Sequence, residues 1–554
     1  MEASLTSRID QLGASKSTAQ LAATIGRQVS VKLLRAVSER EEVILRRDLE
    51  RLLDAGLAWV AADNADTVVF KHALVRDAAY NSLLRSTRQR YHRRIAAVLR
   101  ESFSDETSTR PDLIAGHLTA AGENEEAVAF WEAAAQQALE RTAVHEAATH
   151  FQQAIDCLGR LPTTHQRQQR ELKLHLLLTP LLMDVYGWAA VEAEQAWTRA
   201  LQLAYGLGRQ DLSHAPRWGL WTSQFLRGEL GPALEAAEVV FQTARASDMP
   251  ILELPGHHAV AYTLLYRGEF YSALEKAEAG LAFYNPQQER QIANSFGLSS
   301  AVCLRACRAH SLWMLGRVVE ADDEYNRMLQ IARELGHPLS LASALAFTLH
   351  GAFRYTYTGQ IDRLSGIAEE LMALGNKKSF ALWYAVAYTY QGVIAGARGE
   401  KRRARTQILK GLELFAQTGC RVTLVMMNVV CAEAFYRLED DGRAFQLLEL
   451  AEAETARQEG LLAPDIWRVR GRLLARRDER AAAEAAYHKA IQQAQTQHAL
   501  SLELRAGLDL YELCAQDARA NQGRALLTEI LAHFTQGFDR PELTRARAII
   551  QAPT

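Results

Sequence analysis

A pattern of small and larger apolar residues recurs along most of the chain. After a glycine or polar turn, a small residue follows at the fifth position, a larger one at the ninth and a small one at the twelfth, as in Gly316, Ala321, Tyr325 and Met328. Spacings of four and three place these residues on one helical face, where small side chains let a second helix approach. The first anchors of successive units are Ala147, Ala193, Ala233, Ala273, Ala321, Leu364, Ala404, Ala444 and Ala483.

Most steps between these anchors are close to 40 residues. Each unit is predicted to be an antiparallel helix pair, in which a glycine such as Gly228, Gly268 or Gly359 lets the chain reverse. Because one pair cannot bury its apolar face alone, successive pairs should stack into a superhelix. The pattern predicts a mainly α protein with an α-solenoid of about nine to ten helix pairs.

The first hundred residues follow another pattern. A short apolar helix is expected after Ser30, and Ser38 with Glu41 suggests a capping box before a second helix that ends at Gly56. The segments LAWV and TVVFK are rich in strand formers and are separated by the polar segment AADNAD, which predicts a β-hairpin. Helix, helix, hairpin is the order of elements in a winged helix.

The composition is that of a soluble globular protein, with 48% hydrophobic and 23% charged residues among 554. A formal net charge of −2 provides no global attraction to nucleic acid or to an anionic membrane. Six cysteines are too sparse for a disulfide framework, and the N-terminus lacks the pattern of a signal peptide. The uncharged stretch from Phe380 to Ala397 is assigned to the repeats rather than to a membrane span. A cytoplasmic location is expected, without membrane insertion.

One unit resembles a tetratricopeptide repeat closely. It departs from that pattern at Arg470, where a leucine is usual, and the period near 40 exceeds the usual length of about 34 residues. Longer helices would absorb the additional residues. The matching residues are Trp467, Gly471, Leu474, Ala483, Tyr487 and Ala490.

A wider resemblance begins with FKHALVRDAAYNSLLRSTRQRYHRR, from Phe70 to Arg94. This phrase resembles the winged-helix end of bacterial STAND-type signalling ATPases, which are often fused to an adenylate or guanylate cyclase domain and followed by tetratricopeptide repeats. The resemblance continues through ERTAVHEAATHFQQAI to SLELRAG and FTQGFDRPELTRAR. It implies a remnant linker to an absent ATPase module (1–27), a winged helix (28–104), a helical connector with the first repeat (105–160), the solenoid (161–538) and a C-terminal tail (539–554).

The catalytic parts of that family are missing from the sequence. A phosphate-binding loop needs GxxxxGK[ST], and neither LGASKST around Lys16 nor GARGEKR around Lys401 has this spacing. A cyclase catalytic segment is also missing. We therefore expect a non-catalytic chain without a cofactor, either a fragment or a separate regulator of an ATPase or cyclase module. The alternative is the C-terminal part of an enzyme whose catalytic domains precede this chain.

The resemblance also assigns one nucleotide-sensing candidate. In STAND ATPases the winged helix supplies a histidine, in a Met-His-Asp motif, that contacts the nucleotide phosphate. KHALVRDAA resembles the stretch around this motif and points to His72, although Ala73 stands where the motif has Asp. The role is expected only together with an ATPase domain; otherwise His72 would cap and pack its helix.

DNA binding through the winged helix is the second alternative. Residues 71–100 contain eight Lys and Arg residues against one acid, Asp77, and such a patch could neutralise phosphates. However, the helix expected to enter the groove carries Glu41, Glu42, Asp48 and Glu50, which would repel phosphate. A solvated basic helix or an interdomain contact is favoured over DNA binding.

Two groups of potential metal ligands have simpler interpretations. In HEAATH the histidines are five positions apart, roughly 140° around a helix, whereas the zinc-protease motif needs a spacing of four. Cys303, Cys307 and His310 share a helical face, but a fourth ligand is not in sight. Buried cysteines that behave as small apolar residues explain them better.

A protein or peptide partner is expected on the concave face of the solenoid. In tetratricopeptide arrays the first helix of each pair lines this face, which selects His258 and Tyr262 in one unit and Cys303, His310 and Trp313 in the next. Aromatic rings and neutral histidines suit an extended peptide because they bury apolar area and keep a polar edge. The alternative is that these residues pack between neighbouring helices.

Overall fold

The computed structural model describes residues 2–62, 64, 66–103, 110–247, 249–351, 361–378, 380–455, 460–516 and 519–552. The chain forms two compact units, Met1–Val185 and Tyr186–Thr554. This division falls within the range 161–538 that the sequence assigns to the solenoid. The predicted boundary at 104 lies outside the described residues, and the other predicted domain boundaries stay predictions.

The first unit begins with helices around a small sheet. Helices α3 and α4 and the β2–β3 hairpin follow the predicted order of helix, helix, hairpin, and the strands lie in the order β1-β3-β2 with both neighbouring pairs antiparallel. The β2–β3 hairpin confirms the prediction, whereas β1 was not predicted. The elements are α1 (Glu2–Asp10), a 3-10 turn (Gly13–Ser15), α2 (Lys16–Ile25), β1 (Gln28–Ser30), α3 (Val31–Val37), α4 (Glu42–Asp54), β2 (Ala58–Val60), β3 (Thr67–Phe70), α5 (Ala73–Asn81) and α6 (Arg85–Ser102).

The ends of α3 and α4 test the capping predictions. The Ser30 side chain accepts a hydrogen bond from the Leu33 amide and caps α3, as its position before that helix predicts. The predicted capping box is wrong. Ser38 Oγ accepts from the Arg40 amide instead, and α4 starts at Glu42 without a side-chain cap. The Arg40 guanidinium binds Asp48, a buried carboxylate on α4, at 2.6 Å.

The rest of the first unit is helical. Helix α9 packs against both α8 and α10, and the turns between them use left-handed backbone at Gly122 and Thr142. The anchor Ala147 lies fully buried on α10, as its place in the repeat pattern predicts. The helices are α8 (Pro111–Ala121), α9 (Asn124–Glu140), α10 (Val144–Gly159) and α11 (His165–Tyr186).

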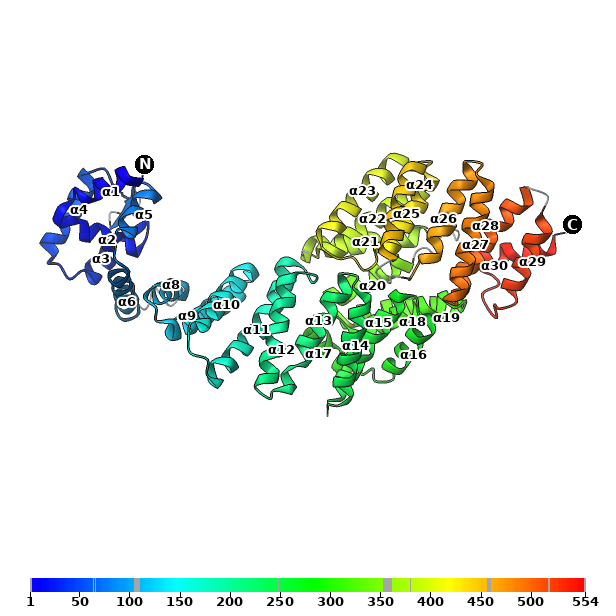
Figure 1. Ribbon diagram of the computed structural model, residues 1–554, viewed down its shortest axis with the longest axis horizontal. Helices are drawn as coiled ribbons and strands as arrows, with labels where there is room; N and C mark the ends of the chain where they lie inside the picture. Colours follow the sequence, from blue (N-terminus) through cyan, green and yellow to red (C-terminus); the bar gives the residue numbers. More distant parts are fainter. Residues whose placement is uncertain are drawn as a thin grey trace. The chain divides into compact units, whose positions relative to one another are not determined.

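The second unit consists of stacked helix pairs (Figure 1). The first helices of the pairs are α13 (His214–Leu226), α15 (Glu253–Arg267), α18 (Ser300–Met314), α20 (Pro338–His350), α22 (Ala381–Ala397), α24 (Leu424–Arg437), α26 (Ala463–Arg476) and α28 (Leu500–Gln516). The second helices are α14 (Leu230–Arg245), α16 (Phe270–Leu281), α19 (Val318–Leu335), α21 (Ile361–Lys378), α23 (Lys401–Gln417), α25 (Asp441–Thr455), α27 (Arg480–Thr496) and α29 (Ala520–Leu531). Helix α12 (Val191–Gly206) precedes the pairs, α17 (Pro286–Phe296) is inserted after α16, and α30 (Pro541–Gln551) follows α29.

The repeat register predicted from the sequence is confirmed. Gly228, Gly268, Gly316 and Gly399 have positive φ at the turns within their pairs, and Glu439 and Asp478 adopt positive φ where the pattern replaces the glycine. The predicted turn at Gly359 lies outside the described residues. The nine first anchors are all buried, eight of them completely and Leu364 to 6% exposure. The long step between Ala273 and Ala321 is explained by the inserted α17.

The early and late pairs of the second unit contact each other directly. The amides of Arg421 and Val422, before α24, donate to the Leu226 carbonyl at the end of α13 at 2.6 and 3.0 Å. The Gly460 amide, before α26, donates to Tyr266 O of α15 at 2.7 Å, and Ser501 Oγ of α28 donates to Trp313 O of α18 at 2.5 Å. Helices α13, α15 and α18 therefore contact the chain at or just before the first helix that lies five pairs later. These contacts close the superhelix on itself.

Three of the early first helices, α15, α18 and α20, are buried on nearly every side. All residues of α15 from Leu254 to Tyr266 are buried, and α18 and α20 are buried almost as completely. The uncharged stretch near Phe380 forms α22, which packs against α21 and α23. Within the described part of the chain, no helix combines the length and apolar character that a membrane span requires.

Candidate functional site

The five residues predicted to line a concave face lie in the interior of the second unit. Their side chains are at most 5% exposed. Tyr262 packs its ring against Phe225 of α13 and Phe347 of α20, and His258 Nδ1 lies 3.3 Å from Ser300 Oγ. The structure therefore places His258, Tyr262, Cys303, His310 and Trp313 among packing residues, and their role in binding a partner stays a prediction.

Burial keeps His258 and Cys303 of this group neutral. Burial lowers the pKa of His258 to about 3 and raises that of the Cys303 thiol well above its usual range. The neighbouring Cys307 Sγ donates to the Ala261 carbonyl at 3.4 Å. Among the residues that the structure describes, no three His, Cys, Asp or Glu side chains are grouped so that they could hold a metal ion.

His72 lies at the N-cap position of α5. Its side chain is exposed and makes no capping hydrogen bond with the helix. Leu74, two residues further on, is 46% exposed. The side chain thus neither caps nor packs, and its nucleotide-sensing role stays a prediction that needs an ATPase domain.

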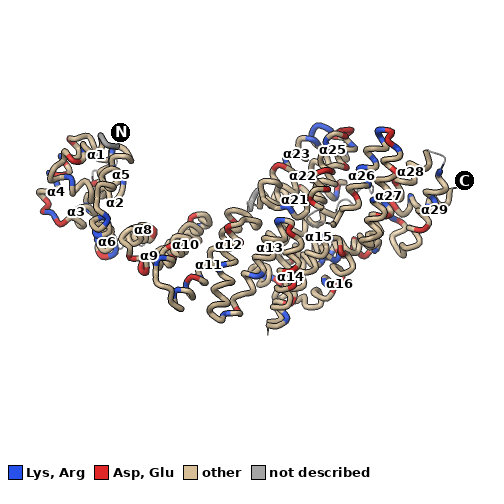
Figure 2. The backbone as a smooth tube through the Cα atoms, in the orientation of Figure 1, with Lys and Arg blue, Asp and Glu red and all other residues tan. Residues whose placement is uncertain are grey.

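The basic helix α6 is engaged within its own unit. Figure 2 shows its Arg residues gathered along the helix. Arg93 binds Glu123 at 2.6 Å, Arg100 binds Glu126 at 2.5 Å, and Arg94 pairs with Glu39. These carboxylates offset three of the six arginines of α6, which weakens the support that this helix gives to the DNA-binding alternative.

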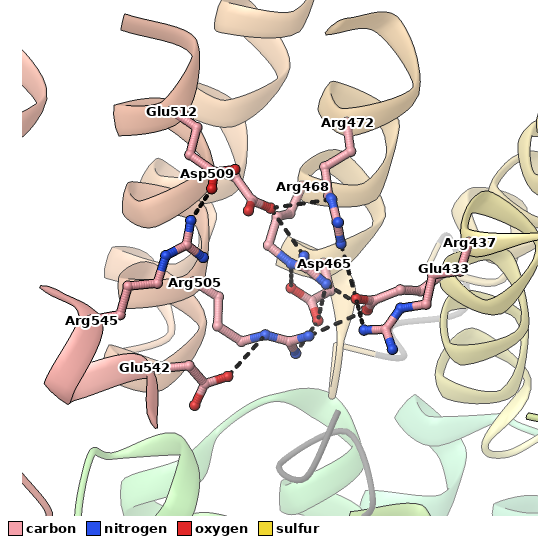
Figure 3. Close-up of polar contacts among 10 residues, drawn as sticks. All are labelled: Glu433, Arg437, Asp465, Arg468, Arg472, Arg505, Asp509, Glu512, Glu542 and Arg545. Carbon is pink, nitrogen blue, oxygen red and sulfur yellow. Dashed lines mark hydrogen bonds and ion pairs between the residues drawn. The ribbon is translucent and has the colours of Figure 1, made fainter. Parts of the chain in front are cut away.

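A second group of charged residues lies on first helices late in the solenoid. Figure 3 shows these side chains converging from α24, α26, α28 and α30. We call them the ionic cluster. Its members are Glu433, Arg437, Asp465, Arg468, Arg472, Arg505, Asp509, Glu512, Glu542 and Arg545.

Arg468 is the centre of the ionic cluster and is only 1% exposed. Its Nε donates to Asp465 at 2.6 Å, and its terminal nitrogens donate to Glu433 at 2.8 Å and Asp509 at 3.1 Å. Arg468 thus joins carboxylates from three first helices. The helical spacing places Asp465, Arg468 and Arg472 on one face of α26.

Arg505 of α28 forms a second centre beside it. It donates to Asp465 Oδ2 at 2.7 Å and to Glu433 Oε2 at 3.3 Å. Its Nε lies 3.9 Å from a carboxylate oxygen of Glu542 on α30. Arg472 and Arg437, which are 20% and 28% exposed, bind the other Glu433 oxygen at 3.1 and 3.4 Å and form the rim of the cluster.

The two glutamates of this centre have opposite electrostatic environments. Burial raises the pKa of Glu433, but Arg468, Arg505, Arg472 and Arg437 outweigh this effect and hold it well below the usual range. For Glu542, burial is the largest cause and raises the pKa to about 7. Glu433 is therefore a fixed negative charge, whereas Glu542 titrates near neutral pH.

The cluster is expected to add little to the stability of the fold. Ion pairs buried at this depth gain little over well-packed apolar residues of similar volume, because the cost of desolvation offsets the attraction. The planar donors of a guanidinium group suit carboxylates, which is the chemistry that this cluster concentrates. The ionic cluster is therefore the best candidate for a functional site in the second unit.

These residues were not predicted as a site. The predicted concave face was taken from two early units, whose first helices carry aromatic and histidine side chains. The available signal was a set of charged residues on otherwise apolar first helices. Arg468 and Arg505 recur one repeat apart, and Asp465 precedes Arg468 by one helical turn.

The stacked helix pairs define the class of protein as a tetratricopeptide-like repeat solenoid, an architecture that suggests a protein-interaction scaffold. No family model matches the chain. An uncharacterized protein of Rhizobium meliloti (strain 1021) is 26% identical over 539 residues, which cover 92% of this chain and 50% of that protein. The chain thus spans about half the length of this curated relative.

Three solved structures share part of the architecture. A Rap protein complexed with competence and sporulation factor has 14% identity, covers 72% of this chain and 99% of its own, and has a TM-score of 0.42. A STAND protein with a tetratricopeptide repeat sensor from Pyrococcus horikoshii has 12% identity, coverage of 73% and 63%, and a TM-score of 0.32. Yeast Tom70 has 10% identity, coverage of 83% and 96%, and a TM-score of 0.30. With these scores, the fold assignment rests on the helix pairs of the chain itself.

Proposed function

We propose that this chain is a non-catalytic regulatory scaffold that binds a protein or peptide partner through its solenoid and regulates an ATPase or cyclase module. The observation that carries the proposal is the ionic cluster. Stacked helix pairs need only apolar first helices, yet three of these helices and α30 bring ten charged side chains together. Such a group provides specificity for a partner.

The link to an ATPase rests on the sequence resemblance between Phe70 and Arg94. The first unit offers a surface that fits such a role. His72 and Leu74 are exposed at the start of α5, and Trp59 and Val60 of β2 are each 43% exposed. Apolar side chains on the surface of a small module favour contact with another protein domain.

Co-purification from the native host tests the proposal. The bait proteins are the wild type, an Arg437→Gln, Arg472→Gln variant at the rim of the cluster, and an Arg402→Gln, Arg403→Gln control on the exposed start of α23. We expect the rim variant to lose a specific partner that the wild type and the control retain, while its melting temperature stays close to that of the wild type. A folded rim variant that keeps every partner would contradict the proposal.

A further inference from the structure

A hollow of about 420 Å³ lies between α25, α26 and α27. Ala463, Ile466 and the partly buried Trp467 of α26 form its apolar wall, and polar side chains of α25 and α27 form the rest. No residue of the ionic cluster lines it. Pockets for small molecules usually have volumes of about 300–1,000 Å³, with an aromatic wall and a few polar groups. We call this site the Trp467 hollow.

Arg470, the departure from the repeat pattern noted in the sequence, lies beside this hollow. Its guanidinium carbon is 4.6 Å from the centroid of the Trp467 ring, and its Nη2 donates to Glu452 Oε2 at 2.8 Å. Glu452 is the carboxylate among the described residues that line the hollow. Because Arg470 pairs with it, this carboxylate repels a bound anion only weakly.

Lys489 of α27 lies on the Trp467 ring. Its Nζ atom is 3.3 Å from the ring centroid. The side chain is exposed, and among the described residues no carboxylate lies within ion-pair distance of this ammonium group. A cation–π contact at an exposed site is weak, so another group can replace the ammonium on the ring.

A ligand that packs on Trp467 must provide for the ammonium group that it displaces. A planar aromatic ring packs well on the indole, since aromatic pairs gain more than their buried area alone provides. A carboxylate attached to that ring gives Lys489 an ion-pair partner, and the side-chain amides of Gln492 and Gln493 are further donors in the hollow. An amine on the ring would instead be repelled by Lys489.

We propose that the Trp467 hollow binds a small aromatic carboxylate, with the ring on Trp467 and the carboxylate on Lys489. The inference goes beyond the proposed function, because it adds a small-molecule site to a scaffold that binds protein. The C-terminal phenylalanine of a peptide carries the same two groups, so the experiment includes both sources.

Isothermal titration calorimetry of the full-length chain with 2-naphthylacetate tests the inference. 2-Naphthylacetamide keeps the ring without the charge, and cyclohexylacetate keeps the charge without a planar ring. We expect 2-naphthylacetate to bind about fivefold more tightly than either control, because each control lacks one of the two contacts. The tripeptide Gly-Gly-Phe represents the peptide source and should bind more weakly than 2-naphthylacetate.

Two variants at exposed positions test the site without changing the core. Lys489→Gln should weaken the binding of 2-naphthylacetate to the level of the amide, whereas Lys410→Gln, on the exposed face of α23, should leave it unchanged. Gln492→Trp places a large side chain at the hollow and should abolish binding. Gln495→Trp, which lies on the same helix but does not line the hollow, is its control.

Three results would overturn the inference. The first is that 2-naphthylacetate does not bind, which would mean that the hollow holds only solvent. The second is that Lys489→Gln or Gln492→Trp binds 2-naphthylacetate as the wild type does, which would place binding elsewhere. The third is tighter binding of Gly-Gly-Phe, which would assign the hollow to a peptide terminus. Melting temperatures equal to that of the wild type confirm that each variant is folded.

Discussion

Replacing Gly411 by alanine probes a close helix crossing in the solenoid. Gly411 lies on α23, where an added Cβ would lie 2.7 Å from the backbone nitrogen and 2.8 Å from the Cα of Thr389 on α22. Real Cβ atoms essentially never approach backbone atoms within 3.0 Å. Since backbone atoms cannot rotate away, the two helices would have to move apart.

The expected cost follows from two opposing effects. Overpacking of a tight contact costs about 1–3 kcal/mol. Alanine also favours the helix over glycine by about 0.5–1 kcal/mol. We therefore expect Gly411→Ala to destabilise the α22–α23 pair by a net ~0–2.5 kcal/mol.

The matched control is Gly366→Ala on α21. This glycine is exposed, and its added Cβ would meet nothing within 4 Å, so only the helix preference remains and the helix should gain about 0.5–1 kcal/mol. Native-state hydrogen exchange measures the free energy of local opening in each helix. The reasoning is refuted if Gly411→Ala stabilises α23 as much as Gly366→Ala stabilises α21.

Three further predictions concern the repeat, the first unit and catalysis. Ala483→Leu should overpack a fully buried anchor and lower the free energy of unfolding by roughly 1–3 kcal/mol. Gln492→Leu, on the exposed face of the same helix, should cost little. An unchanged denaturant midpoint for Ala483→Leu would show that the register is wrong. His92 and His117 pair through their Nδ1 atoms at 2.8 Å, and burial lowers both pKa values from 6.5 to about 4. The contribution of this neutral pair to the free energy of unfolding is therefore complete above pH 6.5 and is lost as the pH falls towards 4. Thermal melts between pH 7 and 4.5 should show a smaller acid loss for His117→Leu than for the wild type. The purified chain should neither hydrolyse ATP nor form cyclic nucleotide; micromolar ATP binding in calorimetry, abolished by His72→Ala, would contradict this.

Much of the fold is predictable because the repeat leaves a local signal. Helix turns at Gly228 or Gly316, and the buried anchors that follow, depend on residues within one pair. Even where Glu439 and Asp478 replace the glycine, the spacing of the anchors located the turn. The predicted capping box at Ser38 does not form because the Ser38 hydroxyl accepts a hydrogen bond from the nearer amide of Arg40.

The closure of the superhelix and the ionic cluster could not be predicted from the sequence, for another reason. The contact between Ser501 and Trp313 joins residues 188 positions apart, and such a contact adds no periodic pattern. Tyr262 and Trp313 were predicted to line a concave face because the first helix of each pair lines this face in tetratricopeptide arrays. In the closed superhelix their side chains are only 5% and 4% exposed, and their role in binding a partner stays a prediction. Arg468 and Arg505 become a site only when α24, α26 and α28 are aligned.

Closure also restricts how this chain can evolve. A linear array can gain or lose a pair by duplication or deletion, because each pair touches only its neighbours. Here the carbonyls of Leu226, Tyr266 and Trp313 meet partners five pairs later. Loss of the α22–α23 pair would move every late helix one position along this seam and leave the three carbonyls facing the wrong segments. The copy number of the repeat is thus held constant by geometry, and homologues with this seam should vary in loop length rather than in the number of pairs.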